Sequence, residues 1–230
     1  MTLFTHGRLL GINMKKLILS GVLMLTSHVF AQSAATVLFT EKKVVANHAG
    51  VERSIARGST LDSGDEVITA DGALANIRYT NGALVNISSN SRYKILDYST
   101  KQPVQIKAEL SHGKIQIKSA GKIKEQLKTP LVTMAIVGTN VRVSVPSDKI
   151  TYIHVIEGVV WARNQYLCAG SSVSVTKNSI IQAEFPVGSD DAVDIVTLAA
   201  IDQLIGSSTV VGMQTIQAAS IVDLSLSCLP

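Results

Sequence analysis

Residues 129–145 read TPLVTMAIVGTNVRVSV, and this stretch decides the fold. Apolar side chains alternate with small or polar ones on both sides of Gly138, and many of them are β-branched. This alternation is typical of a half-buried β-strand. A lone glycine within such a pattern indicates a bulge or a tight corner. The stretch therefore predicts two strands that meet at a corner at Gly138-Thr139.

A tandem repeat lies upstream of this stretch, with DGALANIRYT at 71–80 followed directly by NGALVNISSN at 81–90. Each copy opens with a tight-turn pair, Asp-Gly or Asn-Gly. The repeat fits either one hairpin or two rungs of a coiled sheet. It aligns Asn76 with Asn86, a pair that could form a side-chain ladder. The interpretation that we favour is that both side chains face water.

The rest of the chain divides by its pattern. After a leader (residues 1–31), residues 32–57 form a weakly patterned N-terminal β segment, and residues 58–186 form a β module of short apolar runs and turns. Residues 187–230 form a C-terminal segment that begins with helical spacing of its apolar residues. We expect a mainly β fold, a curled sheet, sandwich or β-solenoid-like module of short strands, with a small and partly helical C-terminal tail.

The N-terminal 31 residues have the pattern of a secretory signal peptide. Met14-Lys15-Lys16 gives a positive start, residues 17–25 form a short apolar core, and Val29-Phe30-Ala31 suits a signal peptidase. We expect cleavage after Ala31, a periplasmic or secreted protein, and a true start at Met14. The alternative is an uncleaved anchor, although the apolar run is short for a membrane span. No span is expected after the leader, because polar residues interrupt every apolar run.

The net charge gives no general reason to expect a polyanionic partner. The chain has 21 basic and 17 acidic residues, a charge of +4. Without Arg8, Lys15 and Lys16 of the leader, 18 basic residues face 17 acidic ones and the charge is +1. Base-stacking aromatic residues interleaved with basic ones are also absent, so no nucleic acid is expected.

One run of the sequence is nevertheless basic. Its lysines are Lys114, Lys118, Lys122, Lys124 and Lys128. They could form a patch for a glycan or another anionic polymer of the cell envelope. The interpretation that we favour is a solvated strand edge, since lysine on an edge opposes aggregation.

The two cysteines, Cys168 and Cys228, both follow the leader. Export to an oxidising compartment would allow them to form a disulfide. The alternative is two unpaired thiols. We expect the pair to form, which would tie the C-terminal tail to the β module.

The search for catalytic chemistry gives little. His48, His112 and His154 do not lie at metal-ligand spacing, and no nucleophile elbow, phosphate loop or dinucleotide motif is present. Because His154 alternates with apolar neighbours, we expect it to be a hydrogen-bonded histidine of a strand. Four acids cluster near a turn, namely Asp62, Asp65, Glu66 and Asp71. They could serve a hydrolase as a carboxylate pair, but turns carry such acids routinely. We expect no enzyme, no metal and no cofactor.

The order of several short motifs resembles the FecR domain over about residues 58–162. The landmarks that carry the resemblance are Gly64, Asp65, Gly72, Gly82, Gly113, Pro130, Gly138, Thr139 and Gly158. The resemblance implies an extracytoplasmic all-β module of short curled strands. In regulators of this family the module senses an outer-membrane transporter and relays the signal to a sigma factor. This chain departs from the family in carrying Val137, where members usually have arginine.

The expectation for function combines these observations. Regulators of the FecR family carry a cytoplasmic sigma-binding region and a membrane helix, where this chain carries the leader. We therefore expect an exported, non-enzymatic module of the cell envelope that binds another envelope protein, without direct contact to a sigma factor.

Overall fold

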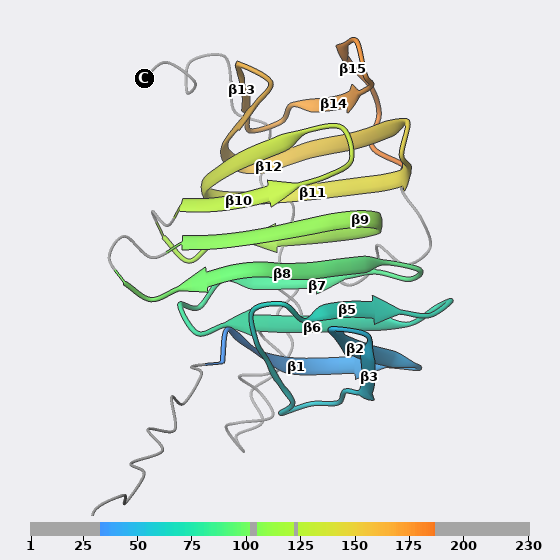
Figure 1. Cartoon of the computed structure of the whole chain (residues 1–230). Coiled ribbons are helices and arrows are strands. Elements are labelled where there is room, and N and C mark those ends of the chain that lie inside the picture. The colour runs from blue at the N-terminus through green and yellow to red at the C-terminus, as the bar shows by residue number, and fades with distance from the viewer. Residues whose placement is uncertain (1–32, 102–104, 122–123, 187–230) are drawn as a thin grey trace, which may run out of the picture. The chain divides into compact units, whose positions relative to one another are not determined.

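The computed structural model describes residues 33–101, 105–121 and 124–186, and these ranges form one fifteen-stranded sheet (Figure 1). Alternating apolar and polar residues account for most of its strands. The strands of the N-terminal half are β1 (Ala35–Glu41), β2 (Val44–His48), β3 (Val51–Ser54), β4 (Thr60–Leu61), β5 (Glu66–Thr69), β6 (Leu74–Tyr79), β7 (Leu84–Ile87) and β8 (Arg92–Ser99). Those of the C-terminal half are β9 (Gln105–Lys118), β10 (Lys124–Lys128), β11 (Thr133–Ser147), β12 (Ile150–Ala162), β13 (Gln165–Cys168), β14 (Ser172–Val175) and β15 (Ile180–Gln182).

The sheet folds into two layers because its three longest strands turn a corner. β9, β11 and β12 each contain a glycine with positive φ, at Gly113 (94°), Gly138 (62°) and Gly158 (80°). The part of each strand on one side of its glycine belongs to one layer, and the part on the other side belongs to the second layer. The long strands therefore join the layers, and the expectation of a mainly β, curled sheet is confirmed.

The hydrogen-bonded neighbours define the two layers. The first layer runs β4-β1-β6-β7, then residues 113–118 of β9, the second half of β11, the first half of β12, β14 and β15. The second layer runs β3-β2-β5-β8, then residues 105–112 of β9, β10, the first half of β11, the end of β12 and β13. The N-terminal β segment thus pairs into the same sheet as the β module.

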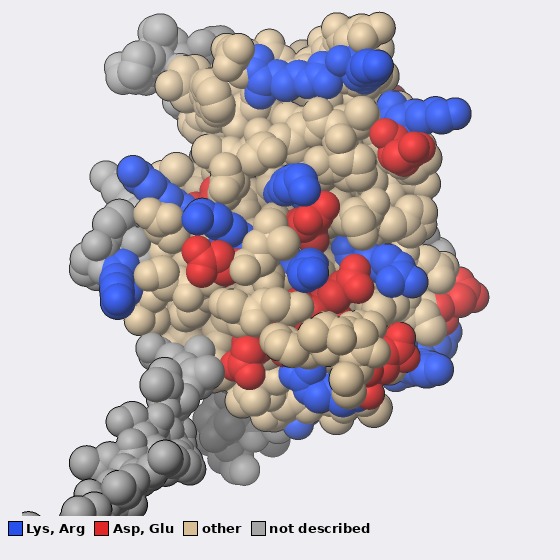
Figure 2. Space-filling model, in the orientation of Figure 1, with Lys and Arg blue, Asp and Glu red and all other residues tan. Residues whose placement is uncertain are grey.

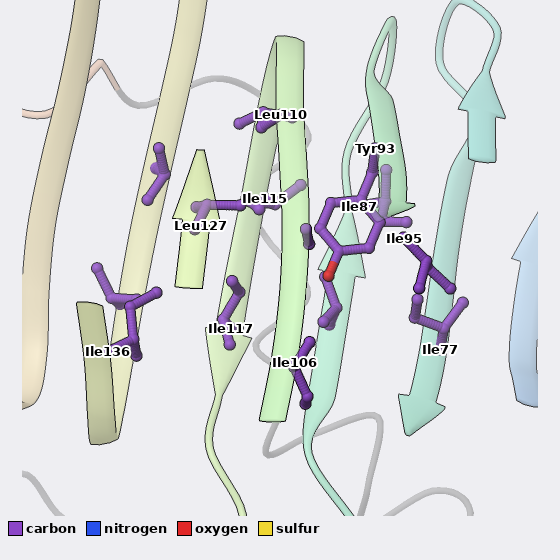
Figure 3. Close-up of a cluster of buried hydrophobic side chains, with 14 of the residues drawn as sticks. Ile77, Ile87, Tyr93, Ile95, Ile106, Leu110, Ile115, Ile117, Leu127 and Ile136 are labelled. Atoms are coloured by element: carbon purple, nitrogen blue, oxygen red, sulfur yellow. The ribbon is translucent and has the colours of Figure 1, made fainter. Parts of the chain in front are cut away.

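The core lies between the layers. Ile77 and Ile115 of the first layer and Ile95 and Leu127 of the second are at most 1% exposed, and Figure 3 shows them among the other buried aliphatic side chains. Burying each such side chain stabilises the fold by roughly 1.5–3 kcal/mol.

A buried hydrogen bond also joins the layers. The Tyr79 and Tyr93 hydroxyl oxygens lie 2.8 Å apart. Burial raises the pKa of both tyrosines, so both hydroxyls stay protonated. One hydroxyl can therefore donate the hydrogen bond that the other accepts.

The corner that the sequence predicts at Gly138 is present, and β11 contains both predicted strands. A Cβ at Gly138 would meet only the Gly121 carbonyl oxygen, at 3.5 Å, so the positive φ is what requires glycine there. Gly158 is constrained twice, because a Cβ would also lie 2.7 Å from the Gly138 carbonyl oxygen. The corners of β11 and β12 therefore pack directly against each other.

The tandem repeat forms one hairpin, in which β6 pairs with β7 and Asn76 lies directly opposite Asn86. The expectation that both side chains face water is wrong, since Asn76 is 1% exposed and Asn86 is 7% exposed. Position in the interior of the first layer does not by itself explain this burial, because Arg78 on the same face of β6 is exposed. The predicted helical tail, residues 187–230, lies outside the described residues.

Candidate functional site

The cluster of acids that could have served a hydrolase is centred on Asp65, which is 1% exposed. Its Oδ2 accepts hydrogen bonds from Arg53 at 2.7 Å and from the Asp62 amide at 2.9 Å. Its Oδ1 lies 2.8 Å from His48 Nδ1 and accepts a further bond from Arg53 at 3.2 Å. Both oxygens are thus engaged by groups of the turn before β5 and of the β2–β3 hairpin.

These contacts decide the charge of Asp65. Burial by itself raises the pKa of this carboxyl. The hydrogen bonds from Arg53, the Asp62 amide and His48 outweigh burial and hold the pKa of Asp65 below its ordinary value. A carboxylate held in this way joins two segments of the chain and has no oxygen left to attack a substrate or to deliver a proton.

Two of the other three acids of the cluster, Asp71 and Glu66, are engaged separately. Asp71 accepts a hydrogen bond from the Asn90 amide at 2.9 Å, and Glu66 lies 3.7 Å from Arg92. No group of three or more His, Cys, Asp or Glu residues is placed to hold a metal ion in the part of the chain that the structure describes. His154 lies on a strand, β12, as expected, and its Nδ1 makes no hydrogen bond within the described residues.

The structure does not gather the described lysines of the basic run on one side. Lys114 and Lys118 lie on β9 in the first layer, whereas Lys124 and Lys128 lie on β10 in the second, and Lys122 is outside the described residues. The interpretation as a strand edge is wrong, because β10 pairs with both β9 and β11. Figure 2 shows one face of the molecule, on which basic and acidic side chains are interspersed.

A set of apolar side chains, here called the aromatic face, lies on the outer side of the second layer near its β13 edge. Its members are Ala135, Val137, Val159, Trp161 and Tyr166. The register sets Ala135 opposite Trp161 and Trp161 opposite Tyr166, and sets Val137 opposite Val159. Val137 is 47% exposed, Trp161 is 40% exposed and Tyr166 is 66% exposed. Their strand neighbours Ile136, Val160 and Leu167 point into the core.

A groove borders the aromatic face. It has a volume of about 390 Å³, and its lining includes Ala135 and Val137 of the aromatic face together with Ile106 of β9 and Gln126 of β10. Lys107 and Lys124 also line it. Glu125 lines the groove as well, so the groove and the aromatic face together combine apolar side chains with charged ones of both signs.

The β13 strand completes this surface. It pairs with β12, and no further strand among those described pairs with it. The turn before it holds Arg163 and Asn164, both with positive φ (44° and 66°), as in a tight hairpin turn. The Arg163 guanidinium fixes the turn by donating to the Lys177 carbonyl oxygen at 2.9 Å. Among the described strands, β13 therefore forms the edge of the second layer, and it carries Tyr166.

Sequence reasoning missed Trp161 and Tyr166 as candidate site residues. The signal was present: aromatic residues flank Arg163-Asn164, and asparagine tolerates positive φ in a two-residue hairpin turn. Cys168 ends β13, opposite Val159. Its predicted partner Cys228 lies outside the described residues, and the pairing stays a prediction.

Comparison with known proteins assigns the class of this β module. Residues 65–161 match the family model described as FecR protein. The chain therefore contains a FecR domain, and the resemblance predicted from the landmarks is confirmed. A search of curated proteins finds no match.

Two solved structures are similar in part. Both are crystal structures of a candidate anti-sigma factor from Parabacteroides distasonis, at 1.65 Å and 2.50 Å resolution. Each is 12% identical to this chain with a TM-score of 0.45, over 51% of this chain and 58% of the other. The chain thus spans little more than half the length of these structures. Within the residues described, no helix is long and apolar enough to cross a membrane.

Proposed function

We propose that this chain is a non-catalytic sensing or regulatory module of the bacterial envelope, which works by binding another envelope protein through the aromatic face. The observation that carries the proposal is the register of Ala135, Trp161 and Tyr166 across three strands, which leaves two large aromatic side chains on the surface beside a groove. Tryptophan and tyrosine are the side chains that contribute most to binding at protein interfaces.

The occupant that fits this surface is an extended segment of the partner. Its backbone adds to the edge of β13, and every second side chain then packs over Tyr166 and Trp161. Extended segments bind to sheet edges in this way because their N–H and C=O groups complete the ladder. Segments with apolar residues in alternation and an acidic flank suit the aromatic face and the lysines that line the groove.

The location in the envelope is supported by the leader pattern at residues 1–31. The FecR domain supports a regulatory or sensing role. The engagement of both Asp65 oxygens supports a role without catalysis, since the acid cluster was the candidate for hydrolysis.

A photo-cross-linking amino acid at position 166 tests the proposal in intact cells. We expect adducts with an envelope protein, mapped to an extended segment with alternating apolar residues. The matched control is the same probe at position 51, since Val51 is 71% exposed but lies on β3, at the opposite end of the second layer. Equal adducts from both positions, or adducts with a sigma factor, would contradict the proposal. Turnover of an envelope substrate by the purified protein would do so as well.

A further inference from the structure

One carboxyl, that of Glu125 on β10, is buried among the apolar side chains of the second layer. Glu125 is 5% exposed, and its Oε1 makes no hydrogen bond within the described residues. The residues directly opposite it in the register are Ile106 of β9 and Ile136 of β11, both buried (Figure 3). Lys124 and Lys128 of β10 alternate with it and are exposed. A buried carboxylate without such partners is unfavourable, so this position suits a protonated carboxyl.

The titratable groups that act on this carboxyl are tyrosines of two other strands. Tyr79 of β6 and Tyr93 of β8 both interact electrostatically with Glu125, and both hydroxyls stay protonated because burial raises their pKa. Burial also raises the pKa of Glu125 to about 7, although the Ser119 hydroxyl acts in the opposite direction. Burial, and no charged partner, therefore holds the proton on Glu125.

The strand that carries Glu125 fills a gap between β9 and β11 in the second layer. Its five residues pair with residues 105–109 of β9 and with residues 133–137 of β11. In the first layer β9 and β11 pair directly with each other, from Lys118 opposite Asn140 to Gly113 opposite Val145. β10 can therefore leave its place without separating the long strands that join the layers, which is the geometry of a local opening.

We propose that protonation of Glu125 controls whether β10 stays docked between β9 and β11. A neutral carboxyl keeps the strand in place, whereas an ionised carboxyl gains hydration when the strand opens. Opening therefore becomes easier as the pH rises, while the first layer stays paired.

This opening would remove part of the groove beside the aromatic face. Lys124 and Gln126 of β10 line that groove, and β10 also pairs with the half of β11 that carries Ala135 and Val137. A molecule in which β10 has opened thus lacks the complete groove. The consequence that a partner binds less well at alkaline pH rests on the proposed function, whereas the opening of β10 does not.

Hydrogen exchange of the full chain measures the opening without any partner. The protection factors of the β10 amides should fall about tenfold between pH 6 and pH 8, because the open form gives up the Glu125 proton more readily than the docked form. In Glu125→Gln they should be the same at both pH values. The matched control is Glu109→Gln, which removes a carboxylate 3.3 Å from the exposed Lys128 of the same strand and should keep the tenfold fall.

The amides of β6 separate local opening from unfolding of the whole sheet. β6 is an interior strand of the first layer, so the β10 amides should be less protected than those of β6 at pH 8. Equal protection of both strands would mean that only global unfolding exposes Glu125, and it would overturn the proposal. A tenfold fall that persists in Glu125→Gln would overturn it too. Glu125→Leu, which also lacks a titrating group, gives the same readout if the glutamine variant does not fold.

This measurement is independent of the test of the proposed function. Adducts at position 166 without a change in β10 exchange would contradict the inference alone. A change in β10 exchange without such adducts would support the inference and contradict the proposed function.

Discussion

At the scale of single residues, two acids of the sheet behave in opposite ways because their neighbours differ. Asp65 is buried with an arginine, a histidine and a backbone amide around its oxygens, and these donors favour its charged form. Glu125 of β10 is 5% exposed, and its Oε1 makes no hydrogen bond within the described residues. Burial raises the pKa of Glu125 to about 7. The same side-chain chemistry therefore stabilises the fold at one site and opposes it at the other.

Glu125 should make stability fall as the pH rises. Its pKa in the folded state is above that in the unfolded chain, so the folded state binds more protons between about pH 4.5 and pH 7 and loses stability across that range. The shift corresponds to about 3 kcal/mol at pH 8. Glu125→Gln should be more stable than the native chain at pH 8 and about equally stable at pH 4.5. Urea unfolding at both pH values measures this.

Glu52→Gln is the control for this prediction, because Glu52 is exposed on β3. It should leave the pH dependence as it is in the native chain. If Glu125→Gln also left the dependence unchanged, the carboxyl of Glu125 would not be the group responsible.

Asp65 should give the opposite dependence. Because the pKa of its carboxyl is below the ordinary value in the folded state, its stabilisation is present above the unfolded pKa and is lost as the pH falls through the folded pKa. Asp65→Asn should cost about 2 kcal/mol at pH 7, the range for hydrogen bonds to charged groups, and less at pH 3. Chemical denaturation at both values tests it, and an equal cost at both would refute the charge-based account.

At the scale of elements, alternation of apolar and polar residues was sufficient to predict most strands. The hairpin of the tandem repeat followed from its turn pairs, although the choice between a hairpin and two rungs needed the structure. The layers could not be predicted, since they depend on register between strands far apart in the sequence, such as β9 with β7 and β11. The aromatic face was missed for the same reason: exposure of Trp161 depends on which neighbours β12 acquires.

The corner of β11 gives a prediction at this scale. Gly138→Val should destabilise the protein more than Thr133→Val, by about 2 kcal/mol, because a β-branched residue is strained at a φ of 62°. Thr133 is exposed in the same strand, and its replacement should have little effect. Thermal melts of the two variants decide it, and equal melting temperatures would show that Gly138 has no special role.

The corner of β12 should tolerate replacement of its glycine still less than the corner of β11 does. Gly158→Ala combines a φ of 80° with a Cβ placed 2.6 Å from Thr139 Cγ2 and 2.7 Å from a carbonyl oxygen. We therefore expect Gly158→Ala to lower the melting temperature more than Gly138→Ala does. The reverse order would mean that the packing of one corner on the other does not stabilise the two-layered sheet.

At the scale of the whole molecule, the sequence predicted the class of fold and the FecR domain, while the site came from the structure. The landmark glycines could be found in the sequence because positive φ restricts those positions to few residues. The candidate basic patch and the candidate acid cluster could not be judged from the sequence in this way. Lysines close together in the sequence lie on different layers, and acids close together in the sequence contact partners from other strands. The contacts of these side chains depend on residues far apart in the sequence, and the sequence alone could not predict them.

The predicted disulfide also belongs to the whole molecule. We expect Cys168 and Cys228 to pair in the exported protein, which would close a loop of about 60 residues and stabilise the fold by roughly 4 kcal/mol on the chain-entropy model. Mass spectrometry of protein alkylated directly in the envelope fraction measures the thiols. Two alkylated cysteines would contradict the prediction.

The central claim is that the aromatic face binds a partner protein, and the most direct test is the affinity of the partner that cross-linking at position 166 identifies. Calorimetry should show that Trp161→Ala weakens binding by roughly thirtyfold or more, the loss typical of a tryptophan that dominates an interface. Val51→Ala, which removes an exposed apolar side chain at the opposite end of the second layer, should bind as the native chain does. Unchanged affinity of a folded Trp161→Ala variant would contradict the account.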